Sequence, residues 1–212
     1  MHSNNSRAKS RRAVTPQRSN GKARVAAVLE AAAAVIAEQG YDAATMAGIA
    51  ARAGAPIGSL YRFFPNKETL AEALVQRFVR LVNEAYDALD RQVATKSLDY
   101  LADALLDFKT SLEPESRAVV ALLEGGSDWP AKRRRFRELT LRRIVRCLVL
   151  WAPALPLAEA GDVAVVLLHN MKTMKNLRLG RDVPVSAGAA TELRRMNRVY
   201  LLDRLGAFRG AS

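Results

Sequence analysis

The sequence predicts an all-α protein, on the strength of its composition and of residues that start and stop helices. Half of the 212 residues are apolar, but only 6% are aromatic. Ala, Leu, Val and Arg are prominent and runs of β-branched residues are few, a composition that favours helices over strands. Apolar residues recur at helical spacing between caps and breakers. A chain of this length can bury a hydrophobic core, as one large domain or two small ones.

Residues 1–20 differ in composition from the rest of the chain. They are rich in Ser, Asn and Arg and contain no acidic residue. Such a segment buries too little apolar surface to fold alone, so we expect a disordered basic tail. Two roles remain open for it: an arm that contacts the minor groove or the phosphates of DNA, and a solubilising or cloning-derived extension.

The first helix is expected from Lys22 to Gly40. Its apolar residues follow a helical period, and a glycine at its end readily adopts the left-handed conformation that follows many helices. The apolar stripe consists of Val25, Val28, Leu29, Ala32, Val35 and Ile36.

Two short helices come next, joined by the tight turn Ala53-Gly54-Ala55. Thr45 can cap the N-terminus of the first helix. Pro56 suits the first turn of the second, because its missing N–H has no intrahelical partner there and its φ is already set. Pro65 ends the second helix. These proportions are those of a helix-turn-helix, whose second helix enters the major groove of DNA.

The residue types of this second helix suit contact with DNA. Gly58 removes a side chain where backbone must approach the DNA, and Ser59 offers a hydroxyl group. Tyr61 and Arg62 can reach phosphates or base edges. Lys67, at the start of the following helix, can add a phosphate contact.

Asn66 can cap a long helix from Lys67 to about Gln92. This helix would join the DNA-binding domain, residues 21–67, to a larger helical domain, residues 68–212. Five further helices are expected, separated by Gly and Pro residues. They span Ser97–Ser111, Pro114–Glu124, Pro130–Trp151, Leu157–Leu179 and Ser186–Phe208.

The charge of the chain indicates a polyanionic partner. The formal net charge is +12 and the pI is about 10.4, and neutralising phosphates releases condensed counterions. Charge by itself does not distinguish DNA from RNA or anionic lipid. A nonspecific nucleic-acid-binding protein is therefore an alternative: it would bind all duplexes alike, whereas a repressor should prefer one palindrome by about a thousandfold.

Other functional classes find little support in the sequence. The single cysteine, Cys147, excludes an internal disulfide and is expected to be a buried small side chain. His2 and His169 lie too far apart in the chain to give zinc-ligand spacing. There is no phosphate-binding glycine loop and no nucleophile with a His partner, so we expect no enzyme, cofactor or metal. No stretch is apolar for long enough to cross a bilayer, so we expect a soluble, cytoplasmic protein.

The stretch from Thr45 to Leu70, TMAGIAARAGAPIGSLYRFFPNKETL, resembles the signature of TetR-family regulators, and the resemblance covers about residues 22–75. It implies an all-helical fold, a homodimer made through the last two helices, and a ligand cavity in the larger domain. It also implies repression that ends when a small molecule fills the cavity and moves the two DNA-binding helices apart.

Carried over by position, the resemblance assigns contacts with the DNA backbone to Thr45, Tyr61 and Lys67. It assigns base contacts to residues 57–59. Because the symmetry of a dimer must match the symmetry of its operator, we expect the two DNA-binding helices to read a short inverted repeat in double-stranded DNA.

Two positions depart from the family pattern. Gly48 stands where the family often has an acidic residue that closes a capping box with the threonine. Ile57 stands where a polar residue often reads bases, and it can instead touch thymine methyl groups.

Candidate effector contacts in the larger domain are mainly apolar. Any one of them could simply belong to the core, although some should line a cavity. His169 and Asn170 lie in an otherwise apolar stretch and are either hydrogen-bonding residues of the dimer interface or polar anchors for a ligand. The composition favours an apolar, uncharged effector over an anion. The candidates are Phe78, Leu81, Phe108, Trp151, His169, Asn170 and Met174.

A second basic run lies between Lys132 and Arg146. It could bind nucleic acid. Because the corresponding helix of the resembled fold lies away from the DNA-binding helix, we favour a solvated face.

Overall fold

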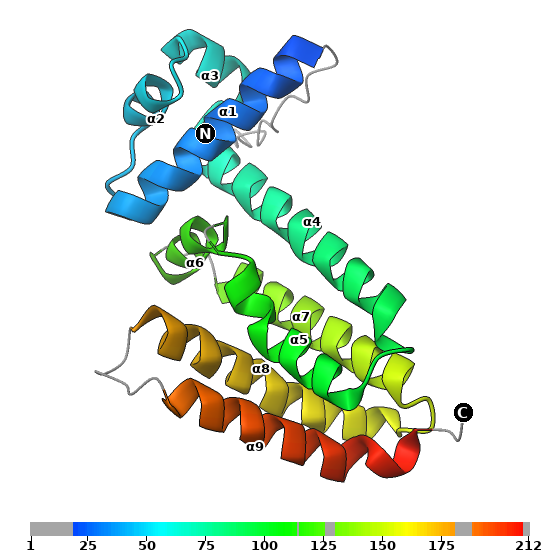
Figure 1. Ribbon diagram of the computed structural model, residues 1–212. Coiled ribbons are helices and arrows are strands. Elements are labelled where there is room, and N and C mark those ends of the chain that lie inside the picture. The colour runs from blue at the N-terminus through cyan, green and yellow to red at the C-terminus, as the bar shows by residue number, and fades with distance from the viewer. Residues whose placement is uncertain (1–18, 114, 126–129, 181–187, 210–212) are drawn as a thin grey trace, which may run out of the picture. The chain divides into compact units, whose positions relative to one another are not determined.

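The computed structural model describes residues 19–113, 115–125, 130–180 and 188–209. Within these residues the chain folds into nine α-helices and one 3₁₀ turn without any strand (Figure 1), which confirms the all-α prediction. Most of the predicted tail, Pro114 and the first residues of the last predicted helix lie outside the described residues. The elements are α1 (Ser19–Gln39), α2 (Met46–Arg52), α3 (Ile57–Phe63), α4 (Lys67–Val93), α5 (Leu98–Ser111), α6 (Glu115–Gly125), α7 (Pro130–Trp151), α8 (Leu157–Leu179), α9 (Gly188–Leu205) and η1 (Gly206–Phe208).

The chain divides into two compact units. The N-terminal unit contains α1, α2, α3, the part of α4 that ends at Phe78, and most of α6. The helical body contains α4 from Val79 onward together with α5, α7, α8 and α9. Each unit has buried apolar side chains of its own.

Side-chain caps and a glycine define the short helices of the N-terminal unit. Oγ1 of Thr45 accepts a hydrogen bond from the backbone N–H of Gly48 at 3.1 Å and caps α2. Gly54 adopts a φ of +58° where the chain leaves α2, a conformation that costs glycine little. At the start of α4, Oδ1 of Asn66 accepts a hydrogen bond from the N–H of Thr69 at 2.8 Å. The predicted caps are therefore confirmed.

The core of the N-terminal unit brings α1 together with α2, α3 and α4. Five of the six residues predicted for the apolar stripe of α1 are buried, and Val25, near its start, is half-buried. Burying one side chain of this size contributes roughly 1.5–3 kcal/mol. The least exposed side chains of this core are Ala32, Ile36, Ile49, Leu60 and Leu70.

In the helical body, α5 packs against α8 and α9, and α8 also packs against α7 and α9. Figure 1 shows these four helices running alongside one another. The ring of Tyr86 on α4 stacks on the ring of Phe108 on α5, with 3.9 Å between centroids. The least exposed aliphatic side chains of this core include Leu101, Leu105, Leu106, Ile144, Leu148 and Leu167.

Several helix boundaries differ from the prediction: α1, for example, begins at Ser19, within the predicted tail, and not at Lys22. Pro56 has extended backbone, φ −60° and ψ 135°, and precedes α3 instead of lying in its first turn. The last helix ends at Leu205 and continues as the 3₁₀ turn η1, because Gly206 is a poor helix former. By contrast, α7 and α8 begin and end at the predicted residues. No helix in the described part of the chain is long and apolar enough to span a membrane.

Candidate DNA-binding surface

Helix α3 presents one face to its own core and the other to solvent. Leu60 is 0% exposed and Phe63 5%, so these two side chains hold α3 in the N-terminal unit. Ile57 is 42% exposed and Tyr61 49%, although both are large and partly apolar. They are four residues apart and therefore lie one above the other on the same helix face. In a helix-turn-helix, the exposed face of the second helix is the surface that enters a major groove, and for Ile57 and Tyr61 this role remains a prediction.

Gly58 lies on the exposed side of α3, where nothing in the protein requires a glycine. A Cβ atom added at this position would meet no atom within 4 Å. The residue is helical, with no positive φ, yet glycine inside a helix costs roughly 0.5–1 kcal/mol relative to alanine. The missing side chain leaves the backbone of α3 open to close approach from outside.

Thr45 is exposed at the N-terminus of α2. Its Oγ1 accepts the capping hydrogen bond from Gly48, which leaves the hydroxyl hydrogen free to be donated. Gly48 is the position that departs from the family pattern, and a Cβ atom there would lie 3.1 Å from Oγ1 of Thr45. The cap therefore works through the threonine alone, without a reciprocal acidic partner at position 48.

Lys67 is partly used inside the N-terminal unit. Its Nζ donates hydrogen bonds to the carbonyl oxygens of Tyr41 at 2.9 Å and Asp42 at 3.1 Å. The same ammonium stands 4.4 Å from the centroid of the Tyr41 ring. Burial, and then the charge of Glu68, raise the pKa of Tyr41 to about 12. Lys67 thus ties the segment between α1 and α2 to the start of α4, with one N–H left for an outside acceptor.

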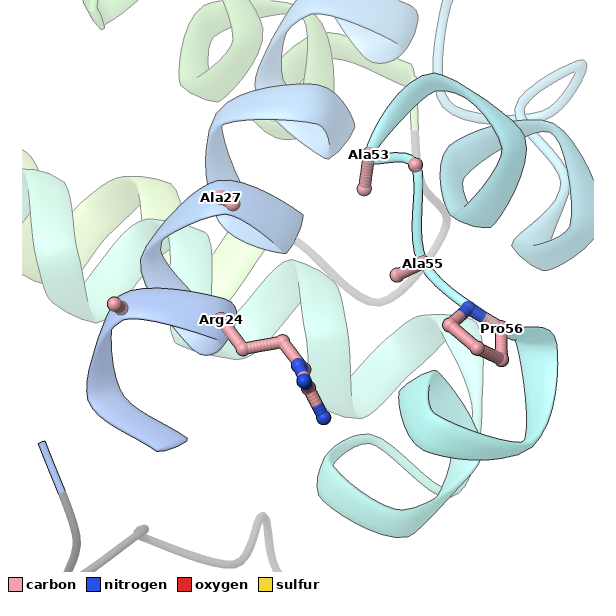
Figure 2. A pocket seen from close by; sticks show the side chains of 7 residues that line it. Arg24, Ala27, Ala53, Ala55 and Pro56 are labelled. Atoms are coloured by element: carbon pink, nitrogen blue, oxygen red, sulfur yellow. The ribbon is translucent and has the colours of Figure 1, made fainter. Parts of the chain in front are cut away.

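A shallow groove of about 400 Å³ lies between α1 and the turn of the helix-turn-helix. Figure 2 shows that the side chain of Arg24 extends from α1 along this groove, on the side of Pro56. Small residues line the rest of it, so no large side chain fills the hollow. The lining residues are Ala23, Arg24, Ala27, Ala53, Gly54, Ala55 and Pro56.

Arg24 was not among the residues predicted from the sequence. It is exposed and has no ion pair or hydrogen bond within the described residues. Arg52 at the end of α2, by contrast, pairs with Glu38 at 2.6 Å. The signal in the sequence was weak, because a single basic residue at the start of an amphipathic helix usually lies on a solvated face.

The candidate effector residues are engaged in separate contacts. Phe108 packs on Tyr86, and Nε1 of Trp151 donates to the carbonyl oxygen of Lys96 at 3.1 Å. Met174 is fully buried, Leu81 is half-buried, and Phe78 is buried in the N-terminal unit.

The polar pair on α8 makes two different contacts. His169 is exposed, and its Nε2 lies 3.2 Å from Nη2 of Arg137. Nδ2 of Asn170 donates to Oδ1 of Asn197 at 2.8 Å and joins α8 to α9. The effector role of these residues remains a prediction.

The basic run of α7 is not one solvated face. Arg133, Arg134 and Arg135 are exposed, as expected. For Arg143 the prediction is wrong: its side chain is only 17% exposed and pairs with Asp87 at 2.5 Å and with Asp90 at 3.0 Å. Two carboxylates of α4 therefore pair with Arg143 and Arg146 in the C-terminal part of the run.

Comparisons with known proteins agree with this geometry. Residues 28–74 match the family model described as bacterial regulatory proteins, tetR family. The HTH-type transcriptional repressor KstR of Rhodococcus jostii is 40% identical over 55 residues, which are 26% of this chain and 26% of that repressor. The match therefore spans about a quarter of the length of that relative.

Solved structures extend the likeness to most of the chain. A protein from Mesorhizobium loti assigned to the TetR family of transcriptional regulators superposes with a TM-score of 0.69 at 19% identity, over 91% of this chain and all of that one. A TetR-family regulator from Streptomyces coelicolor gives a TM-score of 0.56 at 25% identity, over 85% of this chain and 97% of that one. The N-terminal region of the chain thus matches the TetR family of bacterial regulatory proteins, and most of the chain has the fold of TetR-family regulators.

Proposed function

We propose that this protein is a sequence-specific DNA-binding repressor that reads its operator with α3. The observation that carries the proposal is the solvent-exposed face of α3. Ile57 and Tyr61 stand outward from a helix whose opposite side, Leu60 and Phe63, is buried. Exposed large apolar side chains at adjacent turns of a short helix have no stabilising role in the isolated domain and suit contact with a partner.

Base recognition falls to residues 57–59. Ile57 can contact thymine methyl groups, and Ser59 offers a hydroxyl group to base edges. Gly58 supports this assignment because the domain has room for a side chain there and nevertheless lacks one. Close approach of DNA gives a reason for this glycine that packing within the protein does not.

Contacts with the DNA backbone fall to residues around α3. Thr45 has a hydroxyl donor at the N-terminus of α2, and the ring of Tyr61 is exposed on α3. Arg62, the next residue of α3, is also exposed. We add Arg24, whose guanidinium lies along the groove next to Pro56 (Figure 2) and has no ion pair with any residue that the structure describes. Such contacts fix the orientation of the protein on DNA without reading sequence.

The dimer is proposed to form through α8 and α9. These two helices pack against each other and carry six exposed, large apolar side chains. Exposed large apolar side chains on two neighbouring helices are typical of an interface between subunits. A two-fold dimer presents two copies of α3 and therefore requires an inverted repeat. The six residues are Leu157, Val165, Val166, Met196, Val199 and Leu202.

Relief of repression by a small molecule is the remaining part of the proposal. It is supported by the match of residues 28–74 to the tetR family model and by the name of the curated relative, which is a repressor. An effector acts only if it binds the DNA-incompetent arrangement more tightly than the DNA-bound one. The protein would act in the cytoplasm, where the DNA is, and would need no catalytic activity.

The test is selection of bound duplexes from a random pool by the full-length protein, followed by affinity measurements at several salt concentrations. A repressor should enrich an inverted repeat and bind it at least about a thousandfold more tightly than scrambled DNA. Equal binding to enriched and scrambled duplexes would instead establish the nonspecific nucleic-acid-binding alternative.

A further inference from the structure

The groove between α1 and the turn of the helix-turn-helix combines one positive charge with a small, uncharged lining. The side chain of Arg24 extends along it, on the side of Pro56 (Figure 2). Ala27 on α1 and Ala53 and Ala55 in the turn are among the residues that line the rest. The volume of about 400 Å³ is near the lower end for small-ligand sites, roughly 300–1,000 Å³. A sugar with its phosphate is an occupant of this size.

The carboxylates of α1 are paired with other arginines. The helix has two of them, Glu30 and Glu38. Glu30 pairs with Arg77 at 3.3 Å, and Glu38 pairs with Arg52 at 2.6 Å. Arg24 has no ion pair or hydrogen bond within the described residues, so the N–H donors of its guanidinium are available to an anion from outside.

The backbone of the turn is held by hydrogen bonds of its own. The N–H of Gly54 donates to the carbonyl oxygen of Ala51 at 3.1 Å, and the N–H of Ala55 donates to that of Ala50 at 3.0 Å. These contacts set the shape of the groove before anything binds in it. They also occupy two N–H groups of the turn, which leaves Arg24 as the charged donor that can hold an anion in the groove.

The groove continues into the exposed face of α3. Pro56 lines the groove and directly precedes Ile57, the first residue of α3, which is 42% exposed. The Cα atoms of two such neighbours are about 3.8 Å apart. The sugar–phosphate backbones of DNA border the major groove that a helix of this kind enters. A strand whose bases meet Ile57 therefore runs past the groove.

We propose that the groove holds the sugar and the phosphate of one nucleotide in each operator half-site, outside the bases that α3 reads. Arg24 binds the phosphate, with which its planar fork can form two hydrogen bonds. The alanines of α1 and of the turn contact the sugar. The inference rests on the proposed function, because one duplex occupies both α3 and the groove. It adds a site that is matched to the DNA backbone in shape as well as in charge.

The first experiment removes single phosphate charges from the selected operator. Each duplex carries one methylphosphonate, which is uncharged, and fluorescence anisotropy measures its affinity for the full-length protein. One replacement per half-site should weaken wild-type binding by about threefold or more and leave the binding of Arg24→Gln unchanged. Arg80→Gln, which removes an exposed arginine of α4, should show the wild-type pattern.

A pair of alanine substitutions tests the shape of the groove. Ala27→Leu places a large side chain in the groove, whereas Ala26→Leu changes the neighbouring exposed residue of α1, which does not line it. Leucine is a good helix former, so thermal denaturation should show similar stability for both variants. Ala27→Leu should bind operator and scrambled duplexes about tenfold more weakly than the wild type. Ala26→Leu should bind like the wild type.

The dependence of affinity on salt gives an independent measure. A dimer of Arg24→Gln loses two phosphate contacts, one for each groove. The plot of log affinity against log salt concentration should therefore become less steep by about 1.8, which is about 0.9 for each phosphate. Arg80→Gln should keep the wild-type slope.

Three results would overturn the inference: the same phosphate pattern for the wild type and Arg24→Gln, equal affinity of Ala27→Leu and Ala26→Leu, or a wild-type salt slope for Arg24→Gln. The salt slope and the alanine pair are also measured on scrambled DNA, so they report on the groove whether or not the protein prefers one sequence. Failure of the proposed function would appear separately, as the absence of an enriched inverted repeat.

Discussion

Nζ of Lys67 lies 2.9 Å from the carbonyl oxygen of Tyr41 and joins the first residue of α4 to the segment between α1 and α2. A second hydrogen bond runs to the carbonyl of Asp42. Thr45, which caps α2, follows this segment directly. A residue expected to contact phosphate thus also holds the backbone that leads into the helix-turn-helix.

Lys67→Met should therefore lower both stability and DNA affinity. Loss of two hydrogen bonds from a charged, part-buried donor should reduce the free energy of unfolding by about 1–3 kcal/mol. Chemical denaturation checks this value, and anisotropy with specific and scrambled duplexes should show weaker binding to both. Lys22→Met removes an exposed charge from the same unit and should leave stability unchanged. Equal stability of the two variants would show that the carbonyl contacts contribute nothing.

Gly58→Ala should separate folding from DNA binding. The added Cβ meets no protein atom within 4 Å, so the helix should gain up to about 1 kcal/mol of stability. If DNA approaches the backbone of α3 here, operator affinity should fall by about tenfold or more, because the methyl group keeps the backbone from the bases. The control is Gln76→Ala, which changes an exposed residue of α4. Its affinity for the operator should equal that of the wild type. Unaltered binding by Gly58→Ala would remove this residue from the interface.

Exchange of Ile57 should change which bases are preferred. Ile57→Gln replaces an apolar side chain that is 42% exposed with one that can form two hydrogen bonds to adenine. We expect selection from a random pool to shift one position of each half-site from thymine toward adenine on the contacted strand. Tyr61→Ala should instead weaken binding to all sequences alike. An unchanged selected sequence for Ile57→Gln would argue against its role in reading bases.

The parts of this structure that depend on neighbours in sequence could be predicted, and those that depend on distant segments could not. The bounds of α8 follow from Pro156 before it and Gly180 after it, which restrict the backbone locally. The exposed face of α3 follows from helical spacing. Spacing along the chain does not indicate that Lys175 forms an ion pair with Glu113, because this pairing depends on how α8 packs beside the end of α5. The contact of Lys67 with the Tyr41 carbonyl has the same origin.

Asp103 should make stability depend on pH in the acid range. Burial opposes ionisation, but hydrogen bonds from Arg198 and Arg194 on α9 outweigh it and lower the pKa of Asp103. A carboxyl with a lowered pKa in the folded state stabilises the protein above its unfolded pKa, about 3.9, and this contribution is lost as the pH falls through the folded value. Asp103→Asn should cost about 1 kcal/mol at pH 7, and its deficit should shrink below about pH 4.

Denaturation at several pH values measures this difference. Asp99→Asn is the matched control, because its carboxylate is 67% exposed and lies 4.0 Å from Arg198. It should change stability little at any pH. A deficit of Asp103→Asn that is the same at pH 7 and pH 3 would show that the charge of this carboxylate is not what joins α5 to α9.

Val199→Glu should dissociate the proposed dimer without unfolding the protomer. Val199 is 62% exposed on α9, so a carboxylate there is solvated in a monomer. In a two-fold interface the residue would approach the apolar face of a second copy, where an unpaired charge is strongly unfavourable. Sedimentation should show monomers with unchanged helical content, and affinity for the full inverted repeat should fall toward that for a single half-site. Thr95→Glu, on an exposed residue after α4, should remain dimeric. A dimer that persists in Val199→Glu would place the interface on another surface of the helical body.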